Sequence, residues 1–405
     1  MKHLMKNGRI LDGCGNTIEN GWLLIEGERI AGVGAAPRMP GEPVSSCEVT
    51  DLAGKTVMPG LIDGHVHICF DASADAGKGA AGRSDAALAF IAARNAARTL
   101  ASGVTTVRDL GGKNFINLSL RDAIHACQIP GPRILSAAHN ICMTGGHGWQ
   151  FGREADGPDE VRRAVREQMR AGADLIKFMC TGGTLTKTGE PGQTQFTEEE
   201  LRAGIEEAHK AGLKTATHAK GIEGTKYAVA AGIDTVEHGA MLDDELIEWI
   251  LKRGVYVVPT LTAGAHIIEK GTAAGIPEWA VEKARRFRPM RLESLSKARK
   301  AGVKIAFGTD AGTPFNPHGT NASELLHIQE IGLTPAEALI AAASRNAEML
   351  GLQDRIGTIA PGFIADLLIV DGDPLADMRV LTDSEKIHAV FQGGRKVAEK
   401  GNLIW

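Results

Sequence analysis

The stretch GLIDGHVH, residues 60–67, ends a short apolar run with two histidines that are one residue apart. Side chains two positions apart in a β-strand point to the same face, so His65 and His67 would project together from a strand end. Two interpretations are open for such a pair. The histidines are either solvated imidazoles in a turn or ligands of one metal ion, and the rest of the chain discriminates between these.

The composition is that of an ordinary globular protein, with 405 residues, 43% hydrophobic residues and a formal net charge of −4. Only 4% of the residues are aromatic, and lysines and arginines form no run. We therefore expect no nucleic-acid partner, because binding to a phosphate backbone needs a clustered basic face.

Nothing in the sequence predicts a membrane partner or export. No stretch approaches the roughly 20 apolar residues of a membrane span, and the start, MKHLMKNGRILDGCGN, has no apolar signal segment. The six cysteines are scattered without a C-x-x-C motif, which indicates reduced thiols. We expect a cytoplasmic protein.

The middle of the chain alternates short β-rich runs with longer segments of helical periodicity. The runs are residues 61–67, 103–111, 133–140, 175–183, 213–219, 234–239, 255–261 and 304–310. Capping boxes at Thr197 with Glu200 and at Thr334 with Glu337 predict two of the helix starts. Strands interleaved with helices predict an α/β fold with a parallel sheet, and closure of that sheet gives a (β/α)8 TIM barrel. An open doubly wound sheet is the structural alternative.

The two ends of the chain differ from the middle. Residues 1–58 and residues 356–405 are typical of short strands joined by Gly and Asp turns. We expect these two segments to pair into one small, discontinuous β-sandwich domain. The barrel would then occupy residues 59–355.

Several histidines outside the helical segments fall at the C-terminal ends of the predicted strands, where a barrel carries its active site. His218 and His238 end the fifth and sixth strands, and Asp310 ends the eighth. Lys177 lies inside the apolar fourth strand, LIKFM, where an unpaired ammonium group is costly. One solution is a carbamate formed with carbon dioxide, an anionic oxygen ligand that bridges two metal ions. The other is a buried ion pair between Lys177 and Asp310.

Four histidines, one carboxylate and one carbamate suit two borderline divalent ions, and we expect zinc. Such a pair of ions shares a hydroxide and polarises a carbonyl oxygen. Asp310 is then the predicted catalytic base and later the acid that protonates the leaving amine. The alternative role for Asp310 is a helix N-cap or a turn.

Taken in order, these residues resemble the amidohydrolase superfamily. The resemblance is carried by HxH in GLIDGHVH, Lys177, ATHA, VEHG and FGTDAG, and it extends to VMPGLID and GTIAPGFIADLLIVDGDP in the two ends. It implies a metal-dependent hydrolase with a binuclear centre. The implied ligands are His65, His67 and Asp310 on one ion, His218 and His238 on the other, and carboxylated Lys177 as the bridge.

The chain is more closely similar to the prolidase-like branch of Xaa-Pro and Xaa-Arg dipeptidases, which is related to imidazolonepropionase. GVTTVRDLGG, TGGHGW and DAGTPFNPHGTNASEL carry this similarity. Members cleave the amide that links an acyl group to a C-terminal amino acid. The chain departs from them at Lys220, where dipeptidases often have a tyrosine or histidine that contacts the substrate carbonyl.

We therefore expect hydrolysis of a small amide, either a dipeptide or an N-acyl amino acid. Hydrolysis of a xenobiotic urea, carbamate or amide is one alternative, and ring opening or deamination of the imidazolonepropionase type is another. A non-enzymatic scaffold on the same fold is disfavoured, because such proteins tend to lose ligands and this chain keeps all six. Relatives are often homo-oligomers, so we expect one here.

Four further side chains are predicted to contact the substrate. His147, in the loop TGGHGW, and Lys220 are also candidate catalytic groups, since either could stabilise charge on the substrate carbonyl. His139 ends the third strand, and His318 lies in the loop after Asp310. For His147 the alternative is a role in structuring its loop, and for His139 it is a place behind the site.

Overall fold

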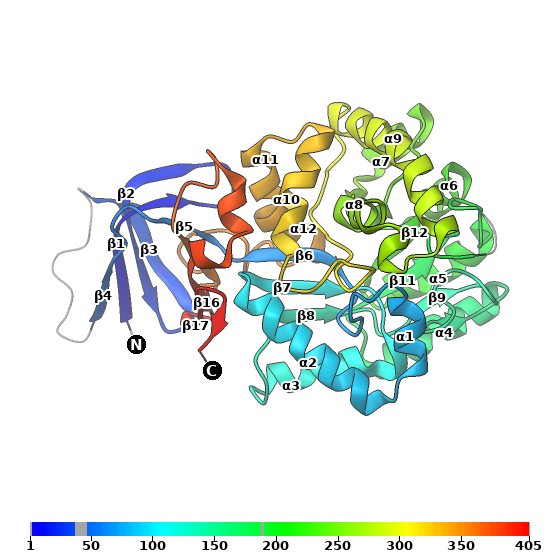
Figure 1. Ribbon diagram of the computed structural model, residues 1–405, viewed down its shortest axis with the longest axis horizontal. Coiled ribbons are helices and arrows are strands. Elements are labelled where there is room, and N and C mark those ends of the chain that lie inside the picture. Colours follow the sequence, from blue (N-terminus) through cyan, green and yellow to red (C-terminus); the bar gives the residue numbers. More distant parts are fainter. Residues whose placement is uncertain (1, 37–46, 188–189, 405) are drawn as a thin grey trace.

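The computed structural model describes residues 2–36, 47–187 and 190–404. It is an α/β structure in which parallel strands are surrounded by helices, with a separate group of strands from both chain ends at one side (Figure 1). The parallel strands form a six-stranded sheet, β10-β9-β11-β12-β13-β14, and a three-stranded sheet, β6-β7-β8. Their bounds are β6 (Leu61–Val66), β7 (Val104–Asp109), β8 (Arg133–Ser136), β9 (Asn140–Cys142), β10 (Arg153–Glu154), β11 (Leu175–Met179), β12 (Lys214–Ala219), β13 (Thr235–His238) and β14 (Tyr256–Val258).

The last predicted run, residues 304–310, is not a regular strand, but its backbone bonds to strands on both sides. Val257 of β14 donates to the carbonyl oxygen of Lys304 at 3.0 Å. On the other side, Gly64 of β6 donates to the carbonyl oxygen of Phe307 at 2.9 Å, and Asp310 donates to the carbonyl oxygen of His65 at 2.7 Å. The segment therefore lies between β14 and β6 and brings the ends of both strands to the same place.

Helices follow most of the parallel strands and cover them on the outside (Figure 1). The capping boxes predicted at Thr197 and Thr334 are confirmed, and they begin α5 and α11. The helix bounds are α1 (Ala76–Gly82), α2 (Asp85–Ala101), α3 (Ile116–His125), α4 (Pro158–Ala171), α5 (Glu198–Lys210), α6 (Ile222–Ala231), α7 (Asp244–Arg253), α8 (Leu261–Lys270), α9 (Glu278–Lys300), α10 (Glu324–His327), α11 (Pro335–Ile340) and α12 (Asn346–Leu350).

Strands from both ends of the chain belong to one nine-stranded sheet. The contact between the ends is made by β5, which pairs parallel with β1 and antiparallel with β15. The buried side chains of this sheet form a core of their own, which includes Met5, Leu23 and Ile369. The expected pairing of the two ends is present, whereas the domain boundaries after residues 58 and 355 stay predictions. The strands are β1 (Lys2–Leu11), β2 (Thr17–Glu26), β3 (Arg29–Ala35), β4 (Cys47–Asp51), β5 (Thr56–Pro59), β15 (Leu367–Val370), β16 (Ile387–Gln392), β17 (Arg395–Glu399) and β18 (Asn402–Leu403).

One residue, Gly60, joins the nine-stranded sheet to the parallel strands, because β5 ends at Pro59 and β6 begins at Leu61. The Gly60 amide donates to the carbonyl oxygen of Asp366 at 2.9 Å. A Cβ at this position would lie 2.3 Å from the hydroxyl oxygen of Thr105, so the junction has room only for glycine.

Among the described residues, no helix combines the length and apolar character that crossing a bilayer requires.

Candidate active site

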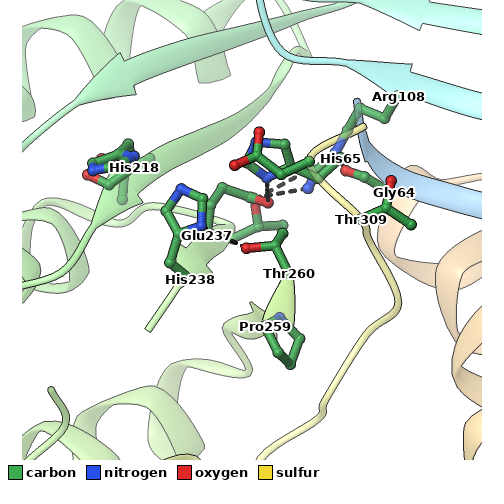
Figure 2. A network of polar contacts seen from close by, with 12 residues as sticks. Gly64, His65, Arg108, His218, Glu237, His238, Pro259, Thr260 and Thr309 are labelled. Atoms are coloured by element: carbon green, nitrogen blue, oxygen red, sulfur yellow. Dashed lines mark hydrogen bonds and ion pairs between the residues drawn. The ribbon is translucent and has the colours of Figure 1, made fainter. Parts of the chain in front are cut away.

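The strand ends bring the predicted ligands together, and Figure 2 shows three of them, His65, His218 and His238. Asp310 Oδ1 lies 3.4 Å from His65 Nε2 and 3.5 Å from His67 Nε2. The possible ligand atoms of His65, His238 and Asp310 all lie within 4.8 Å of one another. The ring of His218 is 4.5 Å from that of His238, measured between centroids. All four predicted histidine ligands therefore lie in one cluster with Asp310.

Two of these residues have an unusual backbone conformation. His238 has φ 71° and Asp310 has φ 61°, both in the left-handed region. For residues other than glycine this conformation costs about 1–3 kcal/mol and is common at functional sites. At His238 it interrupts the alternation of the strand, so that Glu237 and His238, although consecutive, both contact or face His65.

A buried network orients His65 from behind. His65 Nδ1 lies 2.8 Å from Glu237 Oε2, and Glu237 Oε1 accepts from Arg108 Nη2 at 2.8 Å and from the Thr235 hydroxyl at 2.6 Å (Figure 2). Arg108 also donates through Nε to the Gly64 carbonyl oxygen at 2.6 Å. A carboxylate that accepts a hydrogen bond from Nδ1–H favours the neutral tautomer in which Nε2 is unprotonated, and this is the form that binds a metal ion.

The neighbouring histidines are held in a similar way by other acceptors. His67 Nδ1 lies 2.9 Å from the Gly111 carbonyl oxygen, which can only accept, so Nδ1 carries the proton. His238 Nδ1 lies 2.6 Å from the Thr260 hydroxyl. In both residues Nε2 is left for a ligand.

Two buried nitrogen atoms in the cluster have no hydrogen-bond partner among the described residues: Lys177 Nζ and His218 Nε2. Lys177 is only 1% exposed, and no described carboxylate lies within the 4 Å of an ion pair. The alternative of a Lys177–Asp310 ion pair is therefore wrong. Burial lowers the pKa of Lys177 to about 8, an effect that Glu237 partly offsets. Unpartnered nitrogens beside imidazoles and a carboxylate are the donor set of a divalent metal centre.

Asp310 is ionised in this surrounding. Burial on its own raises the pKa of the carboxyl group, but His65 and His67 outweigh that effect, so the pKa lies below its usual range. The carboxylate is therefore available both as a ligand and as a proton acceptor.

The cluster forms the floor of a cavity of about 780 Å³. This volume suits a small organic molecule, since pockets for such ligands span about 300–1,000 Å³. The lining includes aromatic and cationic side chains. The aromatic ones are Phe70, Trp149, Phe151, Trp279 and Phe287, and the cationic ones include Lys220, Arg288 and Arg291.

His147 and Lys220 both line this cavity. The ring of His147 is 4.2 Å from that of His218, and its Nδ1 lies 2.7 Å from the Thr186 hydroxyl. Burial, together with the charge of Lys220, lowers the pKa of His147 to about 3, so this ring is neutral. Burial, together with Arg291, lowers the pKa of Lys220 to about 7. Both side chains are placed where a substrate would lie.

His139 and His318 are not among the described residues that line the cavity. The ring of His139 stacks on Phe115 at 4.3 Å. His318 lies behind the site, where its ring contacts the Thr99 hydroxyl and the carbonyl oxygen of His67, each at 3.1 Å. Both histidines follow strand ends, but their side chains turn toward packed helices and backbone and away from the cavity.

The sequence did not point to Glu237, Arg108 or Arg291 as parts of the site. In the structure Arg108 pairs with Glu237. In a regular strand, consecutive side chains point to opposite faces, so Glu237 and His238 would not be expected to lie on the same side. The left-handed φ of His238 breaks this alternation at the end of β13. Arg291 lies in a helix, α9, whereas the sequence pattern points only to residues at strand ends. The only sequence signal for Arg108 is its position in the apolar run GVTTVRDLG, and the structure buries its side chain.

Comparison with known proteins places the chain in a family. A model of the amidohydrolase family matches residues 56–397. The ochratoxinase of Aspergillus niger is 30% identical, and the match covers 98% of this chain and 87% of the relative. A solved Xaa-Pro dipeptidase with bound methionine in its active site is 34% identical, with a TM-score of 0.89 and coverage of 98% of this chain and 99% of that one. A solved prolidase complexed with N-methylphosphonate-L-proline is 32% identical, with a TM-score of 0.91 and coverage of 98% and 100%.

The family match covers most of the chain and includes every residue of the cluster. Enzymes of this kind act on small molecules and generally use divalent metal ions, in agreement with the donor set at the floor of the cavity. The chain belongs to the amidohydrolase family and is a hydrolase of carbon–nitrogen bonds.

Proposed function

We propose that this enzyme cleaves the amide bond of a dipeptide or an N-acyl amino acid at a centre of two divalent metal ions. The observation that carries the proposal is the pair of unpartnered buried nitrogens, Lys177 Nζ and His218 Nε2, on the floor of the same cavity as Asp310. The similarity to a Xaa-Pro dipeptidase and to a prolidase with a bound proline phosphonate supports the substrate class.

We assign the six ligands as follows. His65, His67 and Asp310 would hold one ion, His218 and His238 would hold the other, and Lys177, converted to a carbamate by carbon dioxide, would supply an anionic oxygen ligand to both. Zinc is the expected metal, because imidazole and carboxylate donors in this number suit it. When bound, the ions would lower the pKa of a water molecule and polarise the substrate carbonyl.

The chain's own groups complete the reaction. Asp310 is ionised and lies at the centre of the cluster, so it accepts a proton from the attacking water and transfers it to the leaving amine. His147 has its Nδ1 engaged by Thr186, which leaves Nε2 free to hydrogen-bond the substrate. His147 and Lys220 then stabilise the negative charge that develops on the carbonyl oxygen.

The proposed scaffold is a closed (β/α)8 barrel over residues 59–355, with a β-sandwich built from residues 1–58 and 356–405. Support for closure comes from residues 304–310, whose backbone bonds to both β14 and β6. The site then lies at the C-terminal end of the barrel, as in other enzymes of this architecture. A homo-oligomer is proposed from the family resemblance alone.

A second candidate substrate is an amino acid acylated by an aromatic group. Ochratoxinase is 30% identical over nearly the whole chain, and the cavity has the aromatic side chains of Trp149, Trp279 and Phe287 in its walls. This reaction uses the same site and the same bond type, so only the acyl group differs.

The proposal is tested by metal content and turnover together. Chelation should abolish hydrolysis, and zinc, cobalt or manganese should restore it. The substrates to screen are Xaa-Pro and Xaa-hydrophobic dipeptides, N-acyl amino acids, aryl ureas and carbamates. Elemental analysis should find two metal ions per active chain. Asp310→Asn should keep its fold and metal but lose turnover by a factor of about 10³ or more, as expected for an essential acid–base group.

The opposing outcomes are equally specific. Full activity of the chelated, metal-free protein would refute the metal mechanism. One metal ion per active chain, together with normal activity of Lys177→Ala, would refute the binuclear centre. Normal turnover of Asp310→Asn would remove Asp310 as the proton carrier.

A further inference from the structure

Asp63 is a buried carboxylate that the proposed reaction does not use. It lies in the GLIDGHVH stretch, two residues before His65, and its side chain is fully buried. Oδ1 accepts from the backbone amides of His65 and Thr309, both at 3.1 Å. Oδ2 accepts from the Thr309 hydroxyl at 2.6 Å and from Asn321 Nδ2 at 2.7 Å. A single oxygen, Oδ1, therefore joins the backbone of His65 to the residue that precedes Asp310.

Every one of these partners donates to the carboxylate. The two backbone amides can only donate. Asn321 Oδ1 accepts from the Gly319 amide at 3.0 Å, so the NH2 group of Asn321 is the end that faces Asp63. The Thr309 hydroxyl oxygen accepts from the Ala311 amide at 3.0 Å, which leaves its own proton for Asp63. The surroundings thus require an acceptor at both oxygens, and a carboxylate meets this requirement whereas a side-chain amide does not.

The same bonds hold the backbone on both sides of Asp310. The Thr309 amide is bound directly by Asp63, and the Ala311 amide is bound through the hydroxyl of Thr309, which is labelled in Figure 2. Asn316 Nδ2 also donates to the Thr309 carbonyl oxygen at 2.8 Å. Asp310 itself has φ 61°, a conformation that persists only where the surrounding structure enforces it. The Asp63 network supplies that enforcement.

The backbone of His65 is tied to the same segment at both of its polar groups. Its amide donates to Asp63, and its carbonyl oxygen accepts from the Asp310 amide at 2.7 Å. Residues 304–310 form no regular strand, so a continuous ladder does not set their register against β6. The separation of 3.4 Å between His65 Nε2 and Asp310 Oδ1 therefore depends on these few bonds.

We propose that Asp63 is a positioning residue of this hydrolase, which holds His65 and Asp310 at the distance that one metal ion requires. The inference rests on the proposed assignment of both residues to the same ion. Asp63 is not among the described residues that line the cavity, so it acts through the backbone of the two that do. An asparagine in its place would set its NH2 group against that of Asn321, or against the two backbone amides if it were reversed.

The first measurement is metal binding, which needs no substrate. Metal-free Asp63→Asn, prepared by chelation, should bind Co²⁺ about 10- to 100-fold more weakly than the wild type, the usual effect of changing a group that orients metal ligands. Competition with a chromophoric chelator gives the affinity. The visible absorption spectrum of the bound Co²⁺, which reports the ligand geometry, should change as well.

An exchange of the two partners provides the rescue. Asn321→Asp alone sets two carboxylates against each other and should also weaken Co²⁺ binding. The double variant Asp63→Asn, Asn321→Asp places an NH2 group opposite a carboxylate again. It should therefore bind Co²⁺ more tightly than either single variant, a coupling that independent sites would not show.

Turnover of a substrate found in the screen gives a second measurement. In Asp63→Asn, kcat should fall by about 10- to 100-fold with little change in KM, because the metal ligands and the proton acceptor are displaced while the substrate contacts stay. The matched control is Asp366→Asn. Asp366 is a buried carboxylate outside the cavity lining that accepts from Arg133 Nη1 and from the Gly393 amide, each at 2.8 Å. This control should lower stability and leave Co²⁺ affinity, the spectrum and kcat unchanged.

The outcomes separate this inference from the proposed function. Wild-type Co²⁺ affinity and spectrum in Asp63→Asn, no recovery in the double variant, or equal losses in Asp366→Asn would overturn the positioning role. If Co²⁺ binding responds as expected but no amide is cleaved, the proposed function fails and the positioning role stands. If Asp63→Asn does not fold, Thr309→Val removes only the hydroxyl that bonds to Asp63. Weaker Co²⁺ binding by that variant supports the inference, and unchanged binding refutes it.

Discussion

At the scale of single residues, the site is organised by what each histidine contacts on the side away from the cavity. His65 contacts a carboxylate, His67 a backbone carbonyl and His238 a hydroxyl. The carboxylate and the carbonyl oxygen place the proton of His65 and of His67 on Nδ1, and the hydroxyl engages Nδ1 of His238, so the Nε2 atoms of all three rings are left for a ligand. Glu237 is distinct among the acceptors because it is charged, fully buried and neutralised by Arg108.

The residue-scale prediction concerns Glu237. In Glu237→Gln the charge that raises the basicity of His65 is lost, and Arg108 keeps a buried charge without a counter-ion. We expect metal affinity to fall by about 10- to 100-fold, as is usual when a hydrogen-bond partner of a ligand is changed. Competition with a chromophoric chelator measures this affinity.

The control for this variant is Glu207→Gln, which removes a carboxylate bonded to Arg166 on α4, outside the cavity lining. It should leave metal affinity unchanged. If Glu237→Gln binds metal as tightly as the control does, Glu237 does not support His65 in the way described.

At the scale of elements, the N-terminus of α8 is capped from another helix. Thr260 has a left-handed backbone and makes no side-chain cap. Instead, the carboxylate of Glu324 accepts from the Leu261 amide at 2.8 Å, the Thr262 amide at 2.7 Å and the Thr262 hydroxyl at 2.6 Å. This arrangement leaves the Thr260 hydroxyl free to contact His238, so the cap of a helix and the orientation of a ligand are linked.

The element-scale prediction follows from the pKa of Glu324, which burial raises from 4.5 to about 7 in spite of the hydrogen bonds from Thr262 and Leu261. Between these values the unfolded chain is ionised while the folded chain keeps the proton. Folding stability from this group is therefore present at low pH and is lost as pH rises through about 7. The total change is about 3 kcal/mol at most, at about 1.4 kcal/mol per pH unit.

Glu324→Gln removes this titration while it keeps the size of the side chain. Denaturant unfolding of metal-free protein should show that the stability of the wild type relative to the variant decreases between pH 4.5 and 7.5. A difference that stays constant over this range would show that Glu324 does not titrate there.

At the scale of the whole molecule, the first of the two chain connections between the nine-stranded sheet and the parallel strands is a single tight position. β5 belongs to the nine-stranded sheet and β6 to the parallel strands, with only Gly60 between them. Because β5 pairs with β15, the C-terminal segment is held against the same junction. Strain introduced at Gly60 is therefore expected to act on both parts.

The molecule-scale prediction is that Gly60→Ala destabilises the protein by about 1–3 kcal/mol, the usual cost of overpacking. The added Cβ would lie 2.3 Å from the Thr105 hydroxyl oxygen and 2.4 Å from its methyl carbon. Thr105→Ala removes both atoms, so the double variant should recover part of the loss, and denaturant unfolding of the four proteins gives the coupling energy. Gly82→Ala is the control, since its Cβ would have no described neighbour within 4 Å. Additive effects of the two substitutions would contradict a direct clash.

The sequence alone determined what local chemistry and periodicity can encode. The β-strand repeat placed His65 and His67 on one face, the Thr–x–x–Glu pattern marked two helix starts, and the order of ligand types identified the family. These features depend only on residue type or on neighbours within a few positions, so they can be predicted before the fold is known. The cluster of His65, His238 and Asp310 could be predicted because strand ends in an α/β fold meet at one edge.

Only the tertiary structure decided which distant groups meet. It turned His139 onto Phe115 and His318 behind His67, although both follow strand ends. It also paired Glu237 with His65 and capped α8 from α10. Such contacts depend on helix packing and on one left-handed residue, His238, whose φ reverses the direction that alternation predicts. The sequence pattern predicts the metal ligands of this enzyme. The packing of the folded chain determines how those side chains are oriented and which other residues line their cavity.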